Sequence, residues 1–311
     1  MTFIKARPRL TAILSVAAFG SVAIYFTRRH FDRSCPRIPI TDLPQSSACR
    51  YLLERAGESP TQKPWGMETS TLLASWSGGD KTHWVPSFTA HQVEVPLSLL
   101  AGYGASSNQD NVAKHDAHHL MQNFVAAFLD ARATGPEATF LDKSRPSLSF
   151  MPASMLFGDR AFPGAFMLGT WSSTTGASIQ PLDLPSDAIK PVSEFFSNRD
   201  VIQGSEVDTA GAVMYWKFPD GLVKSVDQAA SYGCPWRLME GGFQEFIVER
   251  VSDEKARLTY VTIECSNIHP EGQATRDFKR LPWVLYEAHV LYAQSLLAKA
   301  ISQLGKPTCV E

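Results

Sequence analysis

Histidine and glutamate side chains near the end of the chain are the strongest candidates for acid–base chemistry. His289 falls near the middle of the apolar side of a helix predicted over residues 283–304. Desolvation there lowers the pKa of an imidazole and leaves a neutral base near pH 7. Glu245 and Glu264 stand on predicted strands, and an inward carboxylate would need a charge or hydrogen-bond partner, for which His289 and Arg237 are the candidates. We therefore predict His289, Glu245 and Glu264 as catalytic candidates.

Each of these residues also has a plainer interpretation. A histidine on an apolar helix face can be a core residue that donates to a backbone carbonyl, and Glu245, Glu249 and Glu264 can be exposed strand charges. The alternation of the strand does not decide which side Glu245 faces, because Phe243 and Ile247 share its side. If a cavity lies beside the helix, its predicted lining residues are Leu285, Tyr286, Tyr292, Trp216 and Arg237.

Three histidines, His115, His118 and His119, have a spacing that would let imidazoles on one helix share a metal ion. On a helix predicted over residues 111–132 they face away from the apolar side, which carries Phe124 and Phe128. We expect a solvated polar face there, with a metal site as the alternative. The five cysteines contain no C-x-x-C pair, so they favour neither a zinc site nor a disulfide scaffold.

Composition and missing motifs exclude several classes of protein. The 311 residues are 44% hydrophobic, which excludes disorder, and carry 29 Lys+Arg against 31 Asp+Glu, which offers no basic excess for nucleic acid. The chain lacks the phosphate-loop, dinucleotide-binding, serine-hydrolase and H-E-x-x-H patterns. We therefore expect no nucleotide cofactor, no metal and no nucleic-acid partner.

The elements that would position these residues form an α+β order. Alternation and turn residues predict five strands, over residues 88–95, 166–171, 212–218, 243–251 and 258–265. The helix over residues 283–304 follows Pro282, contains no glycine or proline, and ends before Gly305. Its wide apolar side predicts that it lies on a sheet.

This order resembles the START-like or polyketide-cyclase superfamily, over about residues 212–305. The segments MYWKF, FQEFIVERV and LTYVTIEC and the helix PWVLYEAHVLYAQSLLAKAI carry the likeness, which is one of pattern without a diagnostic motif. The resemblance implies a curved antiparallel sheet that grips a long C-terminal helix around an apolar cavity. Membrane-anchored chains of this kind are similar to proteins of fungal small-molecule biosynthetic clusters.

The N-terminal part predicts a membrane anchor. Residues 10–27 carry no charge and are flanked by Arg7, Arg9, Arg28 and Arg29, enough for one short helical span. A cleaved signal peptide and a mitochondrial address are the alternatives. We predict an anchor over residues 1–30, a juxtamembrane spacer over 31–65 and a START-like domain over 66–311. The expected location is the endoplasmic-reticulum membrane, with the mitochondrial inner membrane as the alternative.

Three functions are compatible with this organisation. The first is a membrane-anchored enzyme that binds a hydrophobic small molecule and performs a redox-neutral cyclisation, dehydration or isomerisation. The second is a tethered lipid or sterol carrier that uses the same cavity without chemistry. The third is a scaffold or assembly subunit of a membrane complex. Two ionisable groups that converge on the cavity would favour the enzyme.

Overall fold

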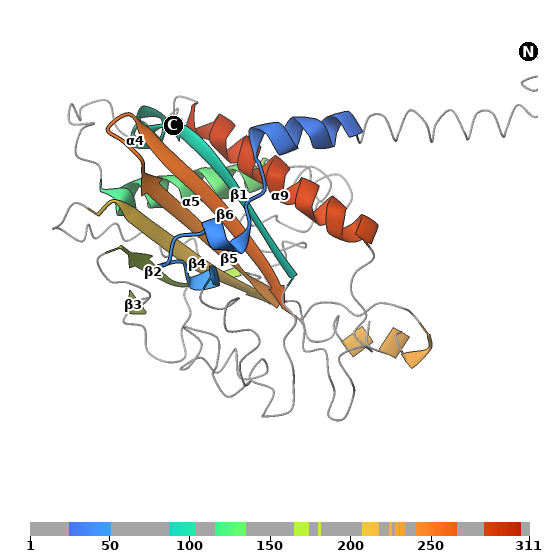
Figure 1. The fold of residues 1–311 in the computed structure, drawn as a ribbon. Helices are drawn as coiled ribbons and strands as arrows, with labels where there is room; N and C mark the ends of the chain where they lie inside the picture. Colours follow the sequence, from blue (N-terminus) through green and yellow to red (C-terminus); the bar gives the residue numbers. More distant parts are fainter. Residues whose placement is uncertain are drawn as a thin grey trace, which may run out of the picture.

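The protein is built around one antiparallel sheet of six strands in the order β1-β6-β5-β4-β2-β3 (Figure 1). The strands are β1 (Ser87–Pro96), β2 (Ala165–Ser172), β3 (Gln180–Pro181), β4 (Thr209–Lys217), β5 (Gly241–Arg250) and β6 (Lys255–Cys265). The computed structural model describes residues 25–50, 87–103, 116–134, 165–173, 180–181, 207–217, 224–225, 228–229, 231–233, 241–265 and 283–305. The first strand pairs with the last, so β1 and β6 are neighbours although about half of the chain separates them.

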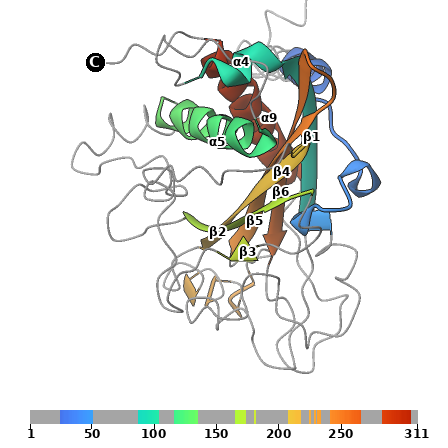
Figure 2. The ribbon, with the colours of Figure 1, turned by 90° about the vertical axis from the view of Figure 1, so that its left-hand side faces the viewer.

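Two helices cover one face of the sheet, which we call the inner face (Figure 2). Helix α5 (Ala117–Ala133) packs on β4 and β5, while α9 (Trp283–Leu304) packs on α5 and on β1. A short helix, α4 (Leu97–Ala101), follows β1 directly. The α+β class is confirmed. The resemblance implied a C-terminal helix held by the sheet, but α5 is the helix that covers β4 and β5.

Helix α5 forms because its start is capped and one side is apolar. The Asp116 carboxylate accepts the backbone N–H of His118 at 3.4 Å, which satisfies a free donor at the helix start. Phe124 and Phe128 are fully buried and contact the ring of Phe246 on β5, with ring centroids 5.6 and 4.8 Å apart. The predicted packing side of this helix is therefore confirmed, and residues 111–115 of the prediction lie outside the described residues.

The opposite face of the sheet, which we call the outer face, is covered by residues 38–50. Leu43 and Cys49 are buried there with Trp171, Phe243 and Ile247. The sequence placed residues 31–65 in a spacer, but residues 35–50 are part of the folded body. The reason is that apolar side chains of this segment, such as Leu43 and Cys49, pack against apolar side chains on the outer face of the sheet.

A glycine on β4 makes room for Trp171 on the outer face. Gly211 pairs with Trp171, and a Cβ at position 211 would lie 2.3 Å from the indole ring. We expect Gly211→Ala to lower the free energy of unfolding by about 2 kcal/mol, because the buried ring must move. Gly305→Ala is the control, since its Cβ meets only contacts of 3.8 Å. Urea unfolding that leaves both variants equal to the parent chain would contradict this packing.

The predicted membrane span falls mostly outside the described residues. Residues 25–34 are helical, and residues 10–24 are not described. Among the described segments, none forms a helix both long and apolar enough to cross a bilayer.

Candidate functional site

Glu245 is fully buried on the outer face of the sheet, away from α9. Its carboxylate accepts four hydrogen bonds: from Ser47 Oγ at 2.6 Å, the backbone N–H groups of Ala48 at 2.8 Å and Cys49 at 3.0 Å, and Trp171 Nε1 at 2.7 Å. Residues 48–50 are helical, so the carboxylate sits at the start of a helical turn, where N–H groups are free.

All four partners of Glu245 act as donors. The Ser47 hydroxyl accepts the N–H of Arg50 at 3.1 Å, which leaves its own proton for the carboxylate. This arrangement fits the ionised form, although burial raises the pKa of Glu245 above its ordinary value and the four hydrogen bonds oppose that shift. Glu245 therefore fastens residues 47–49 to β5, and neither His289 nor Arg237 is a partner in this set of bonds.

A row of buried polar side chains crosses the inner face near the start of β1. Thr89 on β1 pairs with Thr262 on β6, which pairs with Gln244 on β5. We call these three residues the polar row; their exposed fractions are 5, 2 and 6%. The next row on the same face, toward the apolar core, contains His91, Tyr260 and Phe246. On β4 the row continues into Met214, which belongs to the apolar core. The polar row is therefore the last row on this face toward the start of β1 whose side chains the structure describes.

Thr262 has a buried hydroxyl whose Oγ1 finds no hydrogen-bond partner among the residues the structure describes. Leaving a buried hydroxyl unpaired costs about 1–3 kcal/mol. Such a group is therefore a reason to expect a bound molecule or water beside it.

His91 lies beside the polar row and is held as a neutral ring. Its Nδ1 contacts the Cys35 carbonyl at 3.3 Å and its Nε2 contacts Thr89 Oγ1 at 3.1 Å. A neutral imidazole that donates from Nδ1 and accepts at Nε2 satisfies both contacts. The pKa of His91 is lowered from 6.5 to about 4, chiefly by burial. The hydrogen bond to the Cys35 carbonyl and the charge of Asp32 oppose this shift, while Arg37 and His289 add to it.

The first half of α9 lies over the same end of β1. The Tyr286 hydroxyl donates to the Phe88 carbonyl at 2.9 Å. His289 is partly buried and close enough to His91 to influence its pKa. Tyr292 is partly buried and packs against the inner core. The predicted lining residues Tyr286 and Tyr292 and the predicted catalytic residue His289 therefore lie along one stretch of α9.

The remaining predicted residues are only partly described. Leu285, Trp216 and Glu264 belong to α9, β4 and β6, and their side chains lie outside the described part of the structure. The backbone of Glu264 pairs with Ser87 and Gly242. Arg237 and His115 lie outside the described residues altogether.

No metal-ligand cluster occurs among the described residues. His118 and His119 begin α5 and are partly buried, and burial lowers the pKa of His118. His119 Nε2 lies 3.4 Å from the Asn123 amide nitrogen. Within the described ranges, no three side chains of histidine, cysteine, aspartate or glutamate come together as metal ligands.

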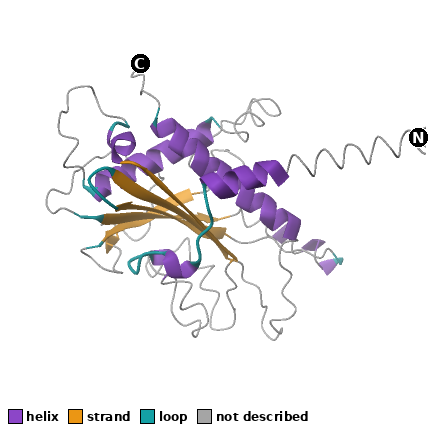
Figure 3. Cartoon of the chain, turned by 45° about the horizontal axis from the view of Figure 1, so that its top comes forward, coloured by secondary structure: helices purple, strands orange, loops and turns teal. Residues whose placement is uncertain are grey.

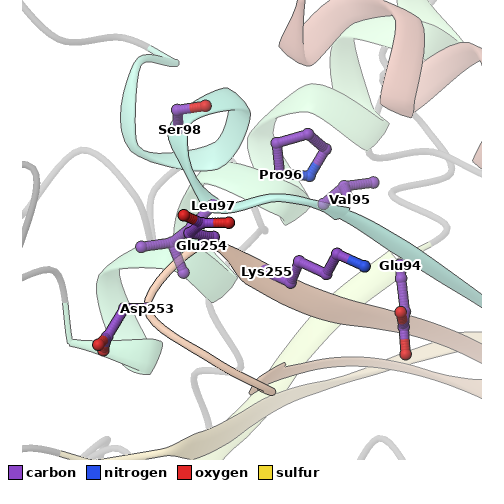
Figure 4. A pocket seen from close by; sticks show the side chains of 8 residues that line it. All are labelled: Glu94, Val95, Pro96, Leu97, Ser98, Asp253, Glu254 and Lys255. Carbon is purple, nitrogen blue, oxygen red and sulfur yellow. The ribbon is translucent and has the colours of Figure 1, made fainter.

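A surface pocket lies at the other end of β1, where the β5–β6 turn meets α4 (Figure 4). Its volume is about 490 Å³, and it is lined by Glu94, Val95, Pro96, Leu97, Ser98, Asp253, Glu254 and Lys255. This lining contains three carboxylates and one ammonium group but no histidine, cysteine or aromatic ring. The polar row is therefore the better candidate for a site.

Sequence reasoning missed Thr89, His91, Gln244 and Thr262. Each of them looks like an ordinary polar position in an alternating strand. The pairing of β6 with both β1 and β5 brings Thr89, Thr262 and Gln244 into one row and places His91 in the next row. No known family, curated protein or solved structure matches this chain.

Proposed function

We propose that the protein binds a neutral, mostly apolar small molecule at the polar row, between the sheet and the first half of α9. The observation that carries this proposal is the line of three buried polar side chains, one of them with an unpaired hydroxyl, at the edge of an apolar core. Ligand sites in proteins are typically apolar, with a few polar groups that fix orientation.

The chemistry of the polar row indicates what the ligand presents. Threonine hydroxyls and a glutamine amide can both donate and accept, and the adjacent His91 ring is neutral at pH 7. A charged ligand group would lose its hydration here without gaining an opposite charge from Thr89, Thr262 or Gln244. A hydroxyl or carbonyl group at one end of an apolar ligand fits this environment.

Binding without chemistry is better supported than catalysis. The predicted partners His289 and Glu245 do not meet, because Glu245 lies on the outer face and is occupied by four donors. Both ring nitrogens of His91 also have partners. The protein is therefore proposed as a carrier or receptor for its ligand.

A redox-neutral enzyme is the second candidate, and one observation favours it. His91 and His289 approach each other at the end of the inner face where the ligand is placed. Two imidazoles can move a proton if the ligand displaces Thr89 from His91. Turnover of the bound compound by the parent chain, and its loss in His289→Phe, would support this candidate over the carrier.

The START-like resemblance is part of the proposal. It is supported by an antiparallel sheet whose first and last strands pair and by a long helix that ends the described chain on the inner face. The position of α9 at the β1 edge departs from a helix held across the middle of the sheet.

The proposal is tested by the compounds that co-purify with the full chain. We expect mass spectrometry of an organic extract to find one neutral compound, or a closely related set, enriched in the parent protein. Thr262→Val should reduce its recovery about tenfold, because the variant keeps the shape of the side chain but removes a hydrogen bond worth about 1.4 kcal/mol.

Thr259→Val is the matched control, since it makes the same change on the same strand but on the outer face, where Thr259 contacts Gln92 at 3.1 Å. Recovery from this control should equal recovery from the parent chain. Equal recovery from Thr259→Val and Thr262→Val, or no enriched compound in any of the three proteins, would contradict the proposed site.

A further inference from the structure

The helix over residues 25–34 has an exposed side that combines aromatic rings with arginines. Tyr25 and Phe26 are 57% and 61% exposed, and among the large hydrophobic side chains of the described residues only Tyr232 is more exposed. Arg29 and Arg33 are exposed one and two turns further along the helix. Two neighbouring exposed aromatic residues are a reason to look for what covers them.

The same helix is fastened to α9 on its other side (Figure 3). The Glu287 carboxylate binds Arg28 at 2.9 Å and Arg37 at 2.8 Å, and Glu287 is only 14% exposed. The Gln294 amide donates to Asp32 at 3.0 Å and to the Cys35 carbonyl at 3.1 Å. The helix therefore keeps a fixed direction relative to α9.

A lipid bilayer is the partner that fits the exposed side. The uncharged sequence over residues 10–27 runs directly into this helix, so Tyr25 and Phe26 stand at its end and the arginines follow. Aromatic rings concentrate at the level of lipid headgroups, and arginines just beyond them are attracted to anionic lipids. This order of residues along one helix side is that of a membrane interface.

The fixed direction of the helix decides which end of the body faces the bilayer. The helix over residues 25–34, α9 and β1 all begin at the right-hand side of Figure 1. The polar row lies near the start of β1, and the β5–β6 turn lies at the opposite end of the sheet.

We propose that this protein is held with the first turns of α9 against the membrane, and that the ligand enters the polar row from the lipid. The identity of the ligand that enters rests on the proposed function. The orientation rests on the ion pairs of Glu287 and on the exposed aromatic and arginine side chains of the helix over residues 25–34.

The orientation is tested with the full chain in vesicles of phosphatidylcholine and phosphatidylserine that contain a headgroup-spin-labelled lipid. A fluorophore is attached at Ala288→Cys, exposed on the first turns of α9, or at Asp253→Cys, exposed in the β5–β6 turn. The unsubstituted chain, labelled in parallel, gives the background from its own cysteines. We expect loss of most of the fluorescence at position 288 and little loss at position 253.

Glu287→Gln in the Ala288→Cys chain removes both ion pairs and should reduce the quenching at position 288. Equal quenching at positions 288 and 253, or no quenching at 288, would overturn the orientation, and unchanged quenching in the Glu287→Gln chain would overturn the role of Glu287. The quenching measurements do not need the ligand, and co-purification of the ligand does not depend on how the protein is oriented at the membrane. The two proposals can therefore fail separately.

Discussion

Glu245→Gln is expected to lower the free energy of unfolding by about 3 kcal/mol, although it changes only one oxygen to an NH₂ group. The four partners of Glu245 all donate, so either placement of the amide NH₂ faces donors. The side chain is fully buried, and water cannot replace the lost acceptor. Urea unfolding of the full chain in detergent measures the change.

Glu249→Gln is the control for this prediction. Glu249 lies on the same strand and face as Glu245, but it is partly exposed. Its carboxylate forms an ion pair with Arg257 at 3.1 Å, and Arg257 also pairs with Glu94. An exposed pair of this kind contributes about 0.5 kcal/mol. If both variants unfolded at the same urea concentration, the four-donor arrangement around Glu245 would be refuted.

His91 is expected to make the fold less stable as the pH falls from 6.5 to 4. Burial lowers the pKa of His91 to about 4 in the folded chain, whereas the unfolded chain binds the proton near 6.5. As the pH falls, protons therefore bind the unfolded state first, and the free energy of unfolding decreases between pH 6.5 and pH 4. The full effect is about 3 kcal/mol, from 1.36 kcal/mol for each pKa unit.

The effect of His91 is isolated by comparison with His91→Gln, which has no titrating group and keeps a donor and an acceptor. Asp32, Arg37 and His289 face His91, so other groups also contribute to the acid unfolding of both chains. We expect the difference in unfolding free energy between the two chains to change by about 3 kcal/mol across the window. Parallel pH profiles would show that His91 is not held neutral.

The local patterns in the sequence predicted the elements well. The helix over residues 283–304 is found with the same bounds, since Pro282 and Gly305 delimit a run of residues that favour helix. The hairpin of β5 and β6 was predicted within a few residues, because both strands alternate and a polar link joins them.

The candidate site could not be predicted because its contacts join distant parts of the chain. Glu245 and its partner Ser47 are 198 residues apart, and alternation alone does not distinguish the two faces when both are buried. The expectation that an inward Glu245 would pair with His289 or Arg237 depended on that undecided choice. The polar row likewise depends on the register of β1 against β6, which no local signal in either strand encodes.

The most direct test of a ligand at the polar row is an experimental density map of the full chain purified without added small molecules. We expect elongated non-protein density with one end within hydrogen-bond distance of Thr262 Oγ1 and Gln244, and the rest against Tyr260 and the first half of α9. A map in which protein side chains fill this space, with Thr262 Oγ1 bonded to one of them, would contradict it.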